Sequence, residues 1–241
     1  MPTKKEAWKN NQVASDFLGI RESIPFGKEQ VQVMVHMIQQ MPHPPQSILD
    51  LGCGDGFTGA FLLSLYPEAA GDFVDYSPPM LEKAKERLKN VPHTRVMEAN
   101  LENTPLPRIV GTTSYDCIVS SYALHHLTHP RKKSIYQEIY NLLNPGGIFI
   151  NVEHVASSTP EVSHIWDELF IDHIFSYKKD HESEISRETV SNDYLTRPDQ
   201  YDNILEPVED QCQWLREIGF QHADIYFKYF EMAVFGGYRK G

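Results

Sequence analysis

Cysteine is scarce in this 241-residue sequence, and the three that occur, Cys53, Cys117 and Cys212, lie far apart. Neither a CxxC metal motif nor an even-numbered disulfide framework can be drawn from them. Long apolar stretches are also missing: no uninterrupted run reaches the roughly 20 residues that a bilayer-spanning helix needs. The first residues contain no apolar signal region. These absences predict a reduced, cytoplasmic protein with no membrane partner.

Positive charge is in short supply as well. The chain has 22 lysines and arginines against 33 aspartates and glutamates, which gives a formal net charge of −11 at pH 7. Such a charge repels a phosphate backbone unless a strong basic patch exists. The longest basic cluster, at 131–133, falls inside an amphipathic helical stretch and is expected to be solvated. We therefore expect a small-molecule substrate, no nucleic-acid partner, and a monomer or homodimer.

From Ser47 onward, short β-branched runs alternate with amphipathic stretches, which is typical of parallel βαβ units. The predicted strands are 47–51, 70–75, 94–99, 116–120 and 147–152, with helices at 58–66, 78–89 and 131–143. Further helices are predicted at 27–41, 161–177 and 207–218. The polar stretch 178–193 is expected to be mobile, and the β-rich runs 223–230 and 232–238 are expected to form an antiparallel pair.

A glycine-rich turn follows the first predicted strand, with glycines at positions 52, 54 and 56. Glycine lets backbone approach a ligand closely, because no Cβ stands in the way. Residues 54–59 satisfy the GxGxxG fingerprint of dinucleotide sites, and Asp75 follows near the position expected for a ribose-binding acid. Taken alone, this loop favours a nicotinamide-dependent oxidoreductase.

Acidic residues around the loop favour a different ligand. Asp50 lies just before the glycines and Asp55 lies among them, so both would oppose the pyrophosphate that a helix N-terminus attracts. A ligand without phosphate that carries an ammonium and a sulfonium suits these carboxylates better, and S-adenosylmethionine (SAM) is such a ligand. Asp75 can accept hydrogen bonds from ribose hydroxyls under either interpretation. A tight turn without any ligand is the less expected alternative.

Four stretches, in the right order, resemble the motifs of class I SAM-dependent methyltransferases: 48–56, 73–81, 115–127 and 142–147. The resemblance implies an α/β fold with a doubly wound, seven-stranded, mostly parallel sheet whose last strand is reversed. It also implies SAM as the cofactor. The implied division is a helical lid at 1–46, a Rossmann-like core at 47–155, a substrate-lid insertion at 156–206, and a helix and hairpin at 207–241.

The resemblance also implies a set of cofactor contacts. In relatives the acid of the second motif binds ribose, and its neighbours flank adenine. One departure concerns the position after the third strand, where such enzymes often carry an aspartate and this chain has Asn100 and Leu101. The Asn100 carbonyl oxygen can still accept a hydrogen bond from adenine. The implied contacts are Asp50, Gly52, Cys53, Gly54, Asp75, Tyr76, Met80, Asn100, Leu101, Ser120 and Ser121.

Candidate catalytic groups follow the ends of the later strands, where α/β enzymes bind their ligands. His125 or His126 could take a proton from a hydroxyl, amine or acid, or could simply pack beneath the cofactor. His125 and His129 have metal-compatible spacing, but Pro130 follows and no nearby carboxylate completes a site, so no metal is predicted. The candidate substrate contacts are Arg21, Glu153, His154, Trp166 and His173.

Three of these candidates also have plainer interpretations. Arg21 is a lone cation that could pair with a substrate carboxylate or lie on the surface. Trp166 and His173 fall on or beside the apolar stripe of a predicted helix, which suits core packing as well as a lid.

The predicted function is methyl transfer from SAM to an oxygen, nitrogen or carbon atom of a small molecule. Three alternatives stay open. The first keeps SAM but transfers an aminocarboxypropyl or carboxymethyl group, or cyclises SAM itself. The second is a nicotinamide-dependent oxidoreductase, and the third is a SAM-binding regulator without catalytic activity.

Overall fold

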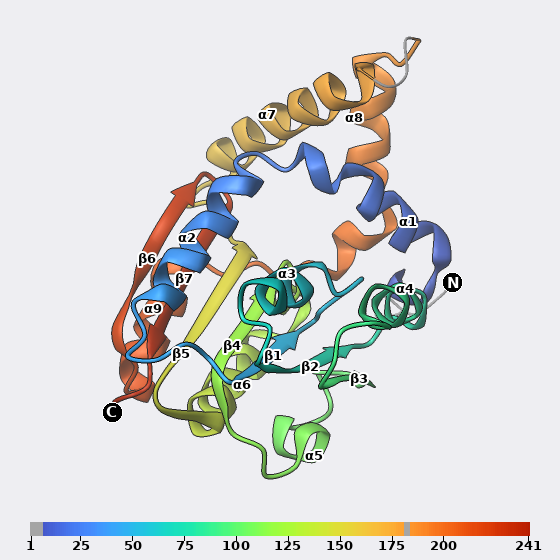
Figure 1. The fold of residues 1–241 in the computed structure, drawn as a ribbon. Helices are drawn as coiled ribbons and strands as arrows, with labels where there is room; N and C mark the ends of the chain where they lie inside the picture. Colours follow the sequence, from blue (N-terminus) through green and yellow to red (C-terminus); the bar gives the residue numbers. More distant parts are fainter. Residues whose placement is uncertain (1–6, 181–183) are drawn as a thin grey trace.

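A seven-stranded sheet forms the centre of the computed structural model, which describes residues 7–180 and 184–241 (Figure 1). Its strand order is β3-β2-β1-β4-β5-β7-β6. The strands are β1 (Ser47–Leu51), β2 (Ala70–Asp75), β3 (Thr94–Glu98), β4 (Tyr115–Ser121), β5 (Leu143–His154), β6 (Gln221–Tyr229) and β7 (Met232–Tyr238). The first five strands run parallel, and β7 is antiparallel to both of its neighbours. The predicted sheet with its reversed last strand is confirmed.

Helices cover both faces of the sheet. One face packs against α2 (Gly27–Gln39), α3 (Phe57–Leu65) and α4 (Pro78–Leu88), and the other against α5 (Leu106–Val110), α6 (His129–Leu142) and α9 (Val208–Ile218). In β1, Ile48 belongs to the first apolar cluster, whereas Leu49 and Leu51 belong to the second. This two-residue alternation explains why β1 reads as a continuous apolar run: each of its faces is buried.

A third layer lies beyond the carboxyl edge of the sheet. It contains α1 (Asn11–Ile20), α7 (Pro160–Lys179) and α8 (Arg187–Thr196), which arch over the strand ends in Figure 1. Short 3-10 turns link this layer to the core: η1 (Ala7–Lys9), η2 (Arg21–Ser23), η3 (Leu124–His126) and η4 (Pro198–Asp202). Its own apolar cluster joins α7 and α8 through Trp166, Phe170, Val190 and Tyr194.

Two predicted segments differ from the structure. The stretch 178–193 contains the first part of α8 instead of mobile chain, because Ser186 caps that helix by accepting a hydrogen bond from the Thr189 N–H at 3.0 Å. Its residues 181–183 lie outside the described residues. The fifth strand, predicted to begin at 147, begins earlier: β5 starts at Leu143, directly after α6 ends, and pairs with β4 through a register shift.

None of the helices within 7–180 and 184–241 combines the length and apolar character needed to cross a bilayer.

Candidate active site

The glycine loop joins β1 to α3 at the point where the chain order of the sheet reverses, between β1 and β4. In open α/β sheets this is where ligands bind. Gly52 and Gly54 have φ values of +66° and +53°, which side chains rarely adopt. A Cβ at Gly52 would lie 2.1 Å from the Ala123 Cβ, whereas one at Gly54 would meet nothing within 4 Å. Gly52 therefore allows close packing, and Gly54 leaves space on the ligand side.

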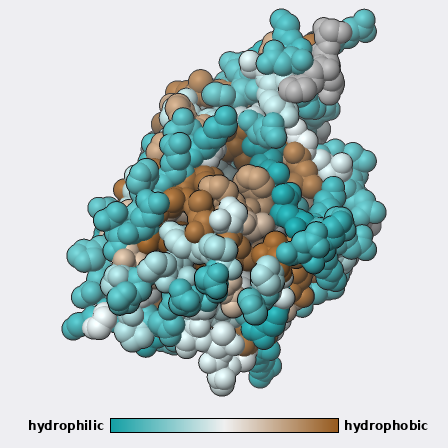
Figure 2. Space-filling model, in the orientation of Figure 1, coloured by the Kyte–Doolittle hydropathy of each residue, from teal (hydrophilic) through white to brown (hydrophobic). Residues whose placement is uncertain are grey.

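A cavity of about 1170 Å³ opens over this loop; we call it the cofactor cavity. Figure 2 shows it as an apolar hollow in the middle of the face, framed by α1, α2 and α3. Its volume slightly exceeds the range of roughly 300–1,000 Å³ that is usual for small-molecule sites. Every predicted cofactor contact lines it except Asp50 and Ser120.

Asp75 lies at the end of β2 and is organised by backbone donors. Its Oδ2 accepts a hydrogen bond from the Gly54 N–H at 2.8 Å, and its Oδ1 accepts one from the Ser77 N–H at 2.7 Å. Burial raises the pKa of Asp75, although these backbone donors partly offset the shift. Each carboxylate oxygen has a further lone pair that can accept a ligand hydroxyl.

Asp50 and Ser120 lie beneath the cavity. The Asp50 Oδ2 accepts a hydrogen bond from Gly59 N–H, in the first turn of α3, at 2.8 Å, and its Oδ1 has no partner among the described residues. Burial raises the pKa of Asp50 to about 7, and the charges of Asp75 and Asp55 add to the shift. The Ser120 Oγ donates to the Leu51 carbonyl oxygen at 2.7 Å. Both residues support the loop from below.

Asp55 is paired rather than free. It accepts hydrogen bonds from the Arg21 guanidinium at 2.8 Å and the Arg87 guanidinium at 2.5 Å, and both cations lie over the Phe57 ring. The two guanidinium groups therefore compensate the charge of Asp55. Most of the negative potential that the sequence predicts at the glycine loop is left to Asp50 and Asp75. Arg21, a predicted substrate contact, instead links the N-terminal segment to the glycine loop.

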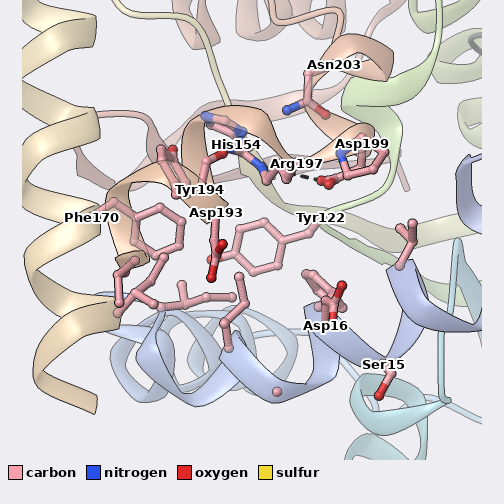
Figure 3. A pocket seen from close by; sticks show the side chains of 18 of the residues that line it. Ser15, Asp16, Tyr122, His154, Phe170, Asp193, Tyr194, Arg197, Asp199 and Asn203 are labelled. Carbon is pink, nitrogen blue, oxygen red and sulfur yellow. Dashed lines mark hydrogen bonds and ion pairs between the residues drawn. The ribbon is translucent and has the colours of Figure 1, made fainter. Parts of the chain in front are cut away.

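A second cavity of about 750 Å³ adjoins the first and is enclosed mainly by α1, α7 and α8; we call it the acceptor pocket (Figure 3). Tyr122, Trp8 and Phe17 line both cavities, so the two spaces meet there. Phe170 and Tyr194 supply aromatic walls. A ligand in the acceptor pocket would therefore face a ligand in the cofactor cavity.

His125 and Glu153 form a buried pair at the inner end of the acceptor pocket. The His125 Nδ1 lies 2.6 Å from the Glu153 Oε1, and Glu153 also accepts hydrogen bonds from the His154 N–H and the Asn151 side chain. Burial lowers the pKa of His125 well below 6.5, and the positive charges of Lys132 and other neighbours act in the same direction. Burial raises the pKa of Glu153. His125 is thus neutral at pH 7, with Nε2 left for a substrate proton.

The other predicted residues lie in different places. His126 lines the cofactor cavity, and its buried Nε2 has no partner within the described parts of the chain. His154 lines the acceptor pocket. Trp166 is fully buried in the third layer, whereas His173 is exposed on α7, and neither lines the two cavities. Within 7–180 and 184–241, no group of three or more histidine, cysteine or acidic residues could hold a metal ion.

Most residues of the acceptor pocket were not predicted, among them Tyr122 and Arg197. Tyr122 has a φ of +50°, and its hydroxyl donates to the Gln30 side chain at 2.5 Å. Arg197 follows α8 and lies over the Tyr194 ring at 4.0 Å. The sequence could have indicated Arg197, because it is a cation within the predicted lid insertion. Nothing in the sequence marks the unusual backbone conformation of Tyr122.

Comparison with known proteins identifies the core. Residues 48–147 match a family model described as a methyltransferase domain. The chain is 26% identical to carboxy-S-adenosyl-L-methionine synthase of Trichodesmium erythraeum over 228 residues, which cover 90% of this chain and 82% of the relative. It is 36% identical to malonyl-[acyl-carrier protein] O-methyltransferase of Anoxybacillus flavithermus over 107 residues, which cover 44% of this chain and 39% of the relative.

Among solved structures, the chain resembles human N-acetylserotonin methyltransferase in complex with SAM, with a TM-score of 0.58 and 16% identity. The match covers 99% of this chain and 57% of that one, so the chain spans little more than half of its length. At this identity the likeness shows the fold alone. Together with the four motifs, the family model and the named relatives support a class I SAM-dependent methyltransferase with SAM as its cofactor.

The residues of the cofactor cavity fit SAM. Asp75 offers carboxylate oxygens for the ribose, with Tyr76 and Met80 beside it, and Gly54, which donates to Asp75, leaves open space next to it. The buried carboxylate of Asp50 and the partly buried carboxylate of Asp75 favour an ammonium and a sulfonium over a pyrophosphate. When bound, SAM supplies an electrophilic methyl group.

Proposed function

We propose that this methyltransferase transfers the methyl group of SAM to a hydroxyl or amine of a small molecule held in the acceptor pocket, with His125 as the general base. The observation that carries the proposal is the buried His125–Glu153 pair. The His125 Nδ1 lies 2.6 Å from the Glu153 Oε1, and His125 lines the acceptor pocket. A neutral imidazole whose other nitrogen is held by a carboxylate is arranged to accept a proton.

The mechanism depends on positioning and on one proton. Asp75 and the glycine loop hold the cofactor, while Tyr122, at the junction of the two cavities, limits where an acceptor can approach. Glu153 accepts the Nδ1 proton of His125 and so fixes the tautomer in which Nε2 is free. As the nucleophile attacks, its proton passes to that Nε2. Near-attack placement lowers the barrier further.

Exclusion of water is assigned to the two predicted lids, 1–46 and 156–206, around the core at 47–155 and the completing segment 207–241. In support, Trp8 and Phe17 come from the first lid and Phe170 and Tyr194 from the second, and all four line the acceptor pocket. Residues 1–6 and 181–183 of these lids lie outside the described residues. Closing these segments over the ligands would keep water from the sulfonium.

The proposal also covers the setting of the reaction. Three buried free thiols support a reducing, cytoplasmic location, and the net charge of −11 supports a small molecule over nucleic acid. We propose a monomer or homodimer without a membrane partner.

A second candidate keeps SAM but not methyl transfer. The relative named carboxy-S-adenosyl-L-methionine synthase matches 90% of the chain, whereas the relative named as an O-methyltransferase matches 44%. This wider match supports a reaction that modifies SAM itself as the alternative. A nicotinamide-dependent reaction has no comparable support.

The role of His125 is tested with methyl-labelled SAM and a metabolite extract, by measuring label transferred to metabolites. We expect His125→Gln to reduce transfer by roughly 100- to 10,000-fold while SAM affinity stays within about twofold. The matched control is His129→Gln, an exposed histidine in α6, which should transfer label as the parent does. Undiminished transfer by His125→Gln would refute His125 as the base.

A further inference from the structure

A second histidine–glutamate pair faces the same pocket. The His154 Nε2 lies 2.7 Å from the Glu231 Oε2, and the other Glu231 oxygen accepts a hydrogen bond from the Ser157 hydroxyl at 2.7 Å. Glu231 is 3% exposed, and His154 lines the acceptor pocket, where Figure 3 places it beside Arg197. The proposed methyl transfer uses His125 and Glu153 and leaves this second pair without a role.

The two histidine rings are neighbours, with centroids 5.7 Å apart. The glutamates that pair with these histidines differ in the positive charge that lies near each of them. Glu153 interacts with the buried ammonium of Lys132, whose Nζ donates to the Leu127 and Ile204 carbonyl oxygens. Because the negative charge of Glu153 is shared with a lysine, it does not keep His125 protonated before the substrate binds. This is one reason why His125 remains neutral.

No lysine is among the side chains that most strongly affect the pKa of Glu231, which are His154, Ser157 and Ser163. Burial raises the pKa of Glu231, but the hydrogen bonds and the charge of His154 outweigh it, and the net pKa is lowered. Glu231 therefore holds the His154 ring in place at the pocket wall through its Nε2, which leaves the other ring nitrogen for a ligand.

Other charged groups surround His154. Asp167, on α7, accepts a hydrogen bond from the Tyr194 hydroxyl at 3.1 Å. Arg197 lies 3.5 Å from Asp199 through its Nε, and its NH1 donates to the Tyr194 carbonyl oxygen. The carboxylates of α7 and η4 are therefore engaged.

Two further acids line the pocket, Asp16 on α1 and Asp193 on α8, and both are exposed to solvent. Screening by water weakens their field inside the pocket. Arg197 supplies positive charge at the corner of the pocket where His154 also lies.

We propose that His154 and Arg197 bind a carboxylate of the acceptor and so place its nucleophile at His125. This deepens the proposed function and rests on it. Each nitrogen–oxygen contact spans about 3 Å, so rings 5.7 Å apart require the carboxylate and the nucleophile to lie only a few bonds from one another. The aromatic walls, Tyr122, Phe170 and Tyr194, suit a flat apolar body. The acceptor class is therefore a hydroxy- or amino-carboxylic acid, best matched by an aromatic one.

The reaction balances without a further reagent. A bond forms between the acceptor oxygen or nitrogen and the methyl carbon, and the bond from that carbon to sulfur breaks with its electron pair. The sulfonium becomes the neutral thioether of S-adenosylhomocysteine. The acceptor proton moves to the His125 Nε2 and then to solvent, while the carboxylate stays on His154 and Arg197 throughout.

The subsite is tested by calorimetry on the full chain saturated with S-adenosylhomocysteine. The probes are 2-hydroxybenzoate and its neutral counterpart 2-hydroxybenzamide. We expect the acid to bind at least about tenfold more tightly than the amide, because a charge-assisted contact is replaced by a neutral one. His154→Gln and Glu231→Gln should each remove that preference, and the exposed control His164→Gln should retain it.

Several results would overturn the subsite: equal binding of the two probes, binding of neither, or a preference that survives His154→Gln. Unchanged affinity for S-adenosylhomocysteine shows that a variant is folded, so loss of the preference cannot be attributed to unfolding. Because this binding needs no turnover, a preference for the acid in a protein that transfers no methyl label would sustain the subsite and reject the proposed function. Methyl transfer without a preference for the acid would sustain the proposed function and reject the subsite.

Discussion

The cofactor cavity and the acceptor pocket are built in different ways. The first centres on the loops at the carboxyl ends of two neighbouring strands, with Gly52 and Gly54 following β1 and Asp75 ending β2. The second is made of side chains that come from α1, the end of β5, α7, α8 and the turn before β7. The comparison teaches that fold geometry fixes where SAM binds, while side chains from distant segments determine what receives its methyl group.

The largest effect on the cofactor cavity is expected from Gly52→Ala. The new Cβ would lie 2.1 Å from the Ala123 Cβ at a backbone φ of +66°, so both overpacking and backbone strain oppose it. We expect the free energy of unfolding to fall by about 2 kcal/mol or more and SAM binding to be lost. Gly19→Ala, in α1 with open space around it, is the control and should cost nothing in thermal denaturation. A stable Gly52→Ala protein that binds SAM would contradict the described loop.

Asp75→Ala tests the same region with less damage to the backbone. Ribose hydroxyls would lose their acceptor, and we expect SAM affinity to weaken by about 1–3 kcal/mol, as measured by calorimetry. Glu98→Ala changes an exposed acid at the end of neighbouring β3 and should leave the affinity unchanged. Equal affinities for the two variants would show that Asp75 does not hold the ribose.

Arg21→Ala tests the link between the regions, because Arg21 lies in the N-terminal segment and pairs with Asp55 in the glycine loop. Arg21 is partly exposed, so the loss is expected to be modest, at about 1 kcal/mol in SAM affinity. Hydrogen exchange should become faster in 11–26 but not in α7. Faster exchange in both segments would indicate a general loosening instead.

The last prediction concerns the pH dependence of stability. The pKa of Asp50 is raised from 3.8 to about 7 by burial, so the folded state holds its proton more tightly than the unfolded state does. Stability from this group is full below about pH 3.8 and is lost as pH rises toward 7. Asp50→Asn should therefore gain melting temperature relative to the parent between pH 5 and pH 8. A constant difference across that range would contradict the raised pKa.

The contrast between the regions also explains what could be predicted from sequence. The positions of the strands and the glycine loop follow from local signals: apolar runs buried on both faces, a serine cap before Pro78, and glycines where φ is positive. The exceptions are informative. The sequence of α8 is mostly polar, and its apolar contact is made by Val190 and Tyr194, which pack against α7. Because this contact depends on a second helix, the polar composition of the segment did not predict α8.

Side-chain partners were harder to predict because they depend on contacts across the chain. Asp55 reads as a free charge near the ligand, yet two arginines from 34 and 32 residues away compensate it. His125 and His126 are adjacent in sequence and equal as candidates, but only His125 meets a buried carboxylate, from residue 153. Glu231 carries no motif at all, and only the register of β5 with β7 brings it to His154.

The most direct measurement is the identity of the nucleoside that leaves the cofactor cavity. The protein is incubated with SAM labelled in its methyl group and with a metabolite extract, and all SAM-derived products are identified by mass. We predict unlabelled S-adenosylhomocysteine in equal amount to a methyl-labelled carboxylic acid. Carboxy-SAM that retains the labelled methyl group, methylthioadenosine, or no SAM-derived product would contradict methyl transfer as the reaction of this chain.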